Sequence, residues 1–124
     1  MSLNVRTEDA RSFMKTIYLK GSLDTETVST FDQELDTVLE SPLKVLVLDL
    51  SELEYLSSAG IRSMFRAQKS MKARAGKALI VNPQPAVQKV FDIVKAVDLS
   101  AVFASVQELD KYLDTIQRKM KEEE

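Results

Sequence analysis

The chain has 124 residues, of which 44% are hydrophobic and 29% charged, and its net charge is -2. This balance fits one compact domain with a single core, and the slight negative charge gives no basic field for nucleic acid. The lack of histidine and cysteine excludes a Ser-His-Asp triad, disulfides and thiol catalysis, and it favours a reducing cytosol. No apolar run reaches the roughly 18 residues that span a membrane, so we expect no direct membrane insertion.

The N-terminal half predicts a β-hairpin followed by a helix. Alternating residues indicate strands over 3–8 and 13–20, joined by the polar stretch DARS, and Gly21 is expected to end the second strand. Asp24 or Thr25 can cap the helix, which Ser41 and Pro42 should stop. Its apolar residues recur at helical spacing, and they are Val28, Phe31, Leu35, Val38 and Leu39.

The second half alternates strands and helices. Apolar runs predict buried strands over 43–50 and 77–82 and a last strand over 99–105. Helices should follow the first strand, the PQP stretch and a capping box of Ser105 and Glu108. This alternation predicts an α/β fold whose small mixed sheet is mostly parallel, with helices packed mainly on one side. The expected core includes Val45, Val47, Leu48, Ile61, Phe65, Leu79, Val90 and Phe91. We expect one domain over residues 1–120 and a charged, frayed tail over 121–124.

Familiar enzyme signatures are missing from the sequence. Only 3 residues are glycine, so neither a P-loop nor a dinucleotide-binding fingerprint fits, and we expect no cofactor. Asp49, Glu52 and Glu54 follow the central strand and suit a metal or acid-base site. We interpret them instead as solvated loop residues, and we expect no metal.

The turn Ser57-Ser58-Ala59-Gly60 is the best candidate site. It follows a predicted parallel strand and opens a helix, at the sheet edge where ligands of open α/β sheets bind. Free backbone N–H groups and the helix dipole favour an anion there. The alternative is a plain helix cap, which serine commonly provides, although two adjacent serines exceed what a cap needs.

The segment VLVLDLSELEYLSSAGIRSMF and the earlier GSLD turn resemble STAS domains, the sulphate-transporter and anti-sigma-factor-antagonist family. The resemblance implies a bacterial, cytoplasmic antagonist that is not an enzyme. Such a protein binds an anti-sigma factor serine kinase, is released when the kinase phosphorylates its serine, and is reset by a serine phosphatase. The matching serine here is Ser58. The family usually has aspartate before it, where this chain has Ser57, so Ser57 is a rival acceptor.

Further residues are expected to contact the partner or the phosphate. Arg62, Arg66 and Lys69 share one helix face, either as a solvated face or as a stripe that docks an acidic surface. Asp24 either caps the first helix, repels a phosphate and shapes partner contacts, or does both. The full expected set is Asp24, Ser57, Ala59, Gly60, Arg62 and Arg66.

Other functions remain open on the sequence. One is a constitutive STAS scaffold, or an accessory subunit of a signalling complex or lipid transporter, that needs no phosphorylation. Another is a module that binds a nucleotide or another anion at the serine turn. The sequence leaves a homodimer open as well.

Overall fold

A computed structural model describes residues 2–96 and 103–123. The four strands form one mixed sheet in the order β1-β2-β3-β4, in which β1 runs antiparallel to β2 while β2, β3 and β4 run parallel. The mixed, mostly parallel α/β sheet is therefore confirmed. In chain order the elements are β1 (Leu3–Arg11), β2 (Met14–Leu23), α1 (Val28–Leu39), β3 (Val45–Leu56), α2 (Ser58–Ala73), β4 (Lys77–Val81), α3 (Pro85–Ala96) and α5 (Val106–Glu122).

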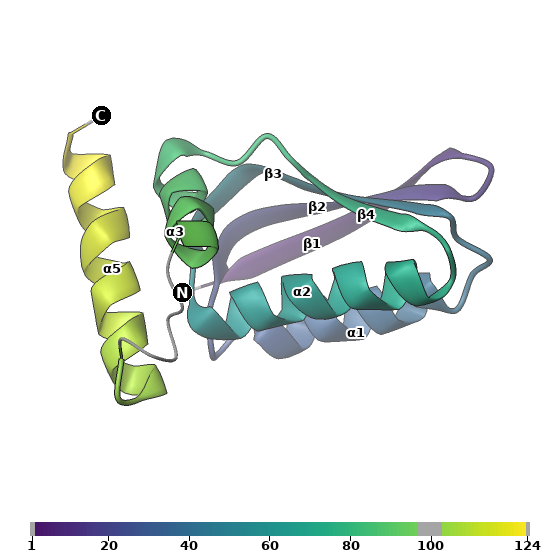
Figure 1. Ribbon diagram of the computed structural model, residues 1–124. Coiled ribbons are helices and arrows are strands. Elements are labelled where there is room, and N and C mark those ends of the chain that lie inside the picture. The colour runs from purple at the N-terminus through teal and green to yellow at the C-terminus, as the bar shows by residue number, and fades with distance from the viewer. Residues whose placement is uncertain (1, 97–102, 124) are drawn as a thin grey trace.

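The helices form two groups around the sheet. Helices α1 and α2 lie side by side along one face, and α3 and α5 stand together at one end of the strands (Figure 1). The apolar stripes of α1 and α2 meet the leucines of β3 in one core. Its fully buried side chains include Phe31, Leu35, Leu46, Leu48 and Met64.

The hairpin is longer than its sequence pattern indicates. Strand β1 continues to Arg11, so most of the DARS stretch is strand, and the turn is made at Ser12 and Phe13. Gly21 does not end the second strand, because β2 continues to Leu23. At Gly21 the backbone has φ +105, and a Cβ would lie 2.3 Å from Ser2 O. Only glycine allows this close crossing, so here it continues the strand instead of breaking it.

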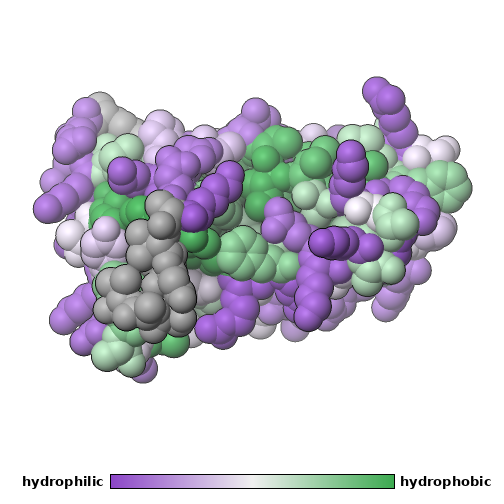
Figure 2. Space-filling model, viewed as in Figure 1, coloured by the Kyte–Doolittle hydropathy of each residue, from purple (hydrophilic) through white to green (hydrophobic). Residues whose placement is uncertain are grey.

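Two of the expected core residues are exposed. Phe65 is 44% and Leu79 43% exposed, and Val45 is half-buried. The reason is the position of β4, whose outer edge has no neighbouring strand in residues 2–96 and 103–123. A groove of about 510 Å³ between β4, α2 and α3 is lined by both exposed side chains. Figure 2 shows apolar side chains gathered over the middle of this face. The other expected core residues are buried, namely Val47, Leu48, Ile61, Val90 and Phe91.

The C-terminal part confirms the last helix. Of the strand expected over 99–105, residues 99–102 lie outside the described residues, and 103–105 do not form a strand. Ser105 caps α5, because its Oγ accepts a hydrogen bond from Glu108 N at 3.2 Å. The helix continues to Glu122, two residues into the predicted tail. Within the described ranges, no helix is both long and apolar enough to cross a membrane.

Neighbouring residues of α2 provide a test of this packing. Met64→Ala should lower the free energy of unfolding by about 2–5 kcal/mol, because Met64 is fully buried and truncation leaves a cavity. Phe65→Ala should cost about 1 kcal/mol or less, because its ring is largely in solvent. Denaturant unfolding measures both values, and equal losses would show that Phe65 packs as Met64 does.

Candidate functional site

The serine turn connects β3 to α2 and is fixed against the end of β2. Ser57 has extended backbone angles and α2 begins at Ser58. Ser57 N donates a hydrogen bond to Leu23 O at 2.9 Å. The GSLD segment, most of which is the end of β2, therefore lies beside the serine turn, as parallel neighbouring strands require.

Ser57 is the cap of α2. Its Oγ accepts from Gly60 N at 3.4 Å, and its side chain is almost fully buried. Gly60 is required by packing, because a Cβ there would lie 2.6 Å from Leu56 Cδ1 and 2.8 Å from Leu23 Cγ. Two residues of the turn thus have structural roles. Ser57 caps the N-terminus of α2, and Gly60 lets the helix pack closely against Leu23 and Leu56.

Ser58 has no such structural task. It is only 8% exposed, yet its Oγ is the one buried side-chain polar atom in residues 2–96 and 103–123 without a hydrogen-bond partner. An unpaired buried hydroxyl opposes folding, and such exceptions mark functional positions. Its backbone N–H is occupied, since it donates to Asp110 Oδ1 of α5 at 2.9 Å.

Asp24 stabilises the turn before α1. Its Oδ1 accepts from Glu26 N at 2.9 Å and from Thr27 N at 3.1 Å. The expectation that Asp24 caps the first helix is wrong in position, because the N-cap of α1 is Thr27, which has no side-chain cap hydrogen bond, and Asp24 stabilises only the turn before it. Its partner-facing role stays a prediction.

Three carboxylates act on Tyr55, which lies two residues before Ser57. Burial, followed by the charges of Asp114, Asp110 and Asp24, raises the pKa of Tyr55 to about 12. The phenol therefore stays protonated through the physiological range, in a site rich in acidic groups.

Two residues of the site were missed from the sequence, and both belong to α5. Asp110 binds the Ser58 amide, and Gln117 binds both backbone groups of Leu56 at 2.8 Å. Gln117 is 1% exposed. The available signal was a glutamine four residues after Leu113, on the apolar face of the last helix.

The two predicted arginines of α2 have different surroundings. The Arg66 guanidinium pairs with Asp36 at 2.9 Å and with Asp32 at 3.1 Å, which joins α2 to α1. Arg62 is exposed, one turn after Ser58, and has no ion pair with any described residue. Contacts of either arginine with a partner or a phosphate stay predictions, and Arg62 has the freer side chain.

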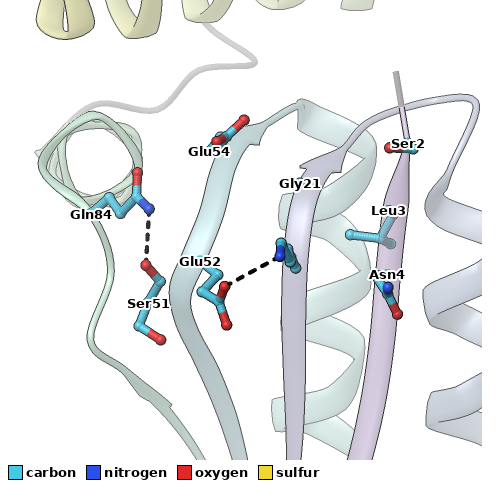
Figure 3. A pocket seen from close by; sticks show the side chains of 9 residues that line it. Ser2, Leu3, Asn4, Gly21, Ser51, Glu52, Glu54 and Gln84 are labelled. Atoms are coloured by element: carbon cyan, nitrogen blue, oxygen red, sulfur yellow. Dashed lines mark hydrogen bonds and ion pairs between the residues drawn. The ribbon is translucent and has the colours of Figure 1, made fainter.

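The acidic residues after the central strand do not form a separate site. Asp49, Glu52 and Glu54 lie on β3 itself and not in a loop. Glu52 and Glu54 line an open hollow of about 500 Å³ on the sheet face away from α1 and α2 (Figure 3). Glu52 pairs there with Lys20 at 3.8 Å. In the described ranges, no group of three acidic side chains is arranged to hold a metal ion.

The neighbouring serines should respond oppositely to alanine. Ser57→Ala should lower the free energy of unfolding by about 0.5–1 kcal/mol, because the cap is lost. Ser58→Ala should leave stability unchanged or raise it by up to about 1 kcal/mol, because an unpaired buried hydroxyl is removed. Thermal and denaturant unfolding of the two variants measure this. A loss at Ser58 as large as that at Ser57 would contradict the assignment of the cap.

Tyr55 should make stability depend on alkaline pH. The folded chain holds the phenolic proton more tightly than the unfolded chain, whose tyrosine pKa is about 10. Its contribution is therefore complete below pH 10 and is lost as the pH rises toward about 12. Denaturant unfolding between these values should show a smaller decline for Tyr55→Phe than for the parent chain. Identical slopes would show that Tyr55 is not protected as described.

Known proteins with similar sequences and folds identify the family of this chain. The model of the STAS domain family matches residues 4–109. A Bordetella bronchiseptica protein with the provisional name anti-sigma factor antagonist BtrV is 29% identical over 75 residues, which are 60% of this chain and 65% of that protein. The match therefore spans less than two thirds of that relative.

Solved structures show the same fold. An anti-sigma factor antagonist from Mycobacterium paratuberculosis aligns with a TM-score of 0.68 and 22% identity, over 82% of this chain and 83% of its own. The Bacillus cell fate determinant SpoIIAA in its phosphorylated form aligns with a TM-score of 0.63 and 20% identity, over 80% and 96%. Since the family model covers most of the sequence, the chain belongs to the STAS domain family.

Proposed function

We propose that this chain is an anti-sigma factor antagonist that acts in the bacterial cytosol. In this proposal it binds an anti-sigma factor serine kinase, phosphorylation of Ser58 ends the contact, and a serine phosphatase restores it. Relatives that carry the name anti-sigma factor antagonist support the partner class. The phosphorylated SpoIIAA structure supports a phosphate-controlled cycle on this fold.

The observation that carries the proposal is the unpaired hydroxyl of Ser58. Its Oγ has no hydrogen bond to lose, and it stands at the position that the family resemblance assigns to the acceptor. In the transfer, Ser58 Oγ attacks the terminal phosphoryl group of ATP, ADP leaves, and the hydroxyl proton passes to a base of the kinase. The chain itself acts as substrate and binding protein, not as a catalyst.

Ser57 is the weaker acceptor. Its hydroxyl accepts the cap hydrogen bond from Gly60 and is 3% exposed. A phosphate on Ser57 would break that cap. On Ser58, by contrast, a phosphate is within one helical turn of the exposed Arg62, which can pair with it.

A phosphate at this turn changes the surface strongly. It brings about -1.5 to -2 charges at neutral pH. The Tyr55 environment already contains the charges of Asp110, Asp114 and Asp24. A partner surface that closes over the turn would then bury negative charge that Arg62 alone does not balance, which weakens binding.

One observation favours a second function. Ser58 is only 8% exposed, and its amide is held by Asp110, so a kinase cannot reach the hydroxyl in this conformation. A constitutive STAS scaffold or accessory subunit, bound through the same surface without phosphorylation, would have this property.

Binding to an anti-sigma partner from the same genome tests the proposal. Ser58→Ala should bind as tightly as the parent chain, because no charge is added. Ser58→Asp should lose about 2–5 kcal/mol of binding free energy, or roughly 30-fold or more in affinity. Titration calorimetry measures both.

The matched control is Ser29→Asp, which adds the same charge on the exposed face of α1. It should bind nearly as the parent does. Equal affinities for Ser58→Asp and the parent chain would reject the switch and favour the scaffold. Lack of binding by the parent chain to any anti-sigma partner would reject the antagonist function itself.

A further inference from the structure

Helix α5 covers the serine turn but contributes little to the core. Of its 17 residues only Leu113 and Gln117 are buried. Helix α2, with 16 residues, buries seven. Elements with few buried contacts open locally at a lower free-energy cost than the core does. Among the helices around the turn, α5 is therefore the one that can leave most easily.

Two polar side chains of α5 bind the backbone on either side of Ser57. The Gln117 amide donates to Leu56 O and accepts from Leu56 N, both at 2.8 Å. Asp110 Oδ1 accepts from Ser58 N at 2.9 Å. The two residues are seven positions apart, or about two helical turns, so they project from the same side of α5. One face of α5 thus holds the backbone on both sides of Ser57.

A phosphate on Ser58 would compete with Asp110 for the backbone N–H group of Ser58. The N–H group of Ser58 is part of the helix N-terminus, which favours anions, and a carboxylate now occupies it. The hydroxyl of the same residue is buried and unpaired beside it. A phosphate on that hydroxyl would compete for the amide and repel Asp110 and the nearby Asp114.

We propose that α5 is a latch, through Asp110 and Gln117, and that a phosphate on Ser58 releases it. This rests on the proposed function, in which a kinase transfers the terminal phosphoryl group of ATP to Ser58 Oγ with loss of ADP and the hydroxyl proton. The kinase binds the closed turn, and transfer to Ser58 requires that the latch opens transiently in that complex, so the latch limits the phosphorylation rate. Both latch residues follow residue 109, the last one that the STAS model matches.

Release would expose a new surface. Leu109, Leu113 and Ile116 of α5 are buried or half-buried against the domain, and they would become accessible together. Phosphorylation would thereby change the shape of the serine turn as well as its charge. An anti-sigma partner that fits the closed turn would lose its binding surface in both respects.

Hydrogen–deuterium exchange on the full chain tests the release. In the phosphorylated chain, or in Ser58→Asp, the amides of α5 and of Leu56 should exchange at least tenfold faster than in the parent chain. Amides of α1 and of the first half of β3 should keep their protection. Unchanged protection of α5 in both forms would overturn the latch.

A second variant opens the latch without changing the serine. Gln117→Leu keeps the side-chain size but loses the hydrogen bonds to Leu56. It should speed exchange across α5 and raise the rate of Ser58 phosphorylation at least fivefold. The matched control is Gln107→Leu on the exposed face of the same helix, which should do neither. Equal phosphorylation rates for Gln117→Leu and Gln107→Leu would overturn the gating.

The two claims fail separately. If Ser58 is phosphorylated while α5 keeps its protection, the latch is wrong and the proposed function stands. If no kinase modifies Ser58, the proposed function is wrong, and exchange in Ser58→Asp still decides whether charge releases α5.

Discussion

The junction between β3 and α2 depends on contacts from both ends of the chain. The backbone of Leu56 is held by Gln117, and the amide of Ser57 by the carbonyl of Leu23. Helix α2 approaches this junction closely because Gly60 has no side chain to collide with Leu23 and Leu56. These contacts fix the direction of α2 and leave the Ser58 hydroxyl unpaired at its first residue. The geometry of the candidate site thus follows from the packing of α2 against the ends of β2 and β3.

Charge around the junction explains how one small group can act on binding. The net charge of the chain is only -2, yet three carboxylates act on Tyr55 beside the turn. A phosphate on Ser58 would add its negative charge to the negative field of these carboxylates. Because the contacts of α5 with the turn are mainly polar and its buried apolar surface is small, that field acts on the element most easily displaced. In the proposed switch, binding and conformation are coupled through the same few groups.

Much of the fold could be predicted from the sequence, because hydrophobic periodicity is local information. The helices over α1, α2, α3 and α5, the central strand and the position of the serine turn all followed from it. The predictions for Gly21, Phe65 and Leu79 failed, because they depended on particular tertiary contacts. The crossing of Ser2 over Gly21 keeps β2 intact, and the outer edge of β4 leaves Leu79 and Phe65 exposed. The contacts of Asp110 and Gln117 join residues more than 50 positions apart, which no local pattern reveals.

In the proposed switch, phosphorylation of Ser58, and not of the neighbouring Ser57, controls partner binding at this surface. The most direct test of this claim is tandem mass spectrometry of the protein isolated from cells that contain the anti-sigma kinase. The account predicts a single phosphate that maps to Ser58, persists in Ser57→Ala and disappears in Ser58→Ala. A phosphate that maps to Ser57, or a chain that leaves its partner while it carries no phosphate, would contradict the account.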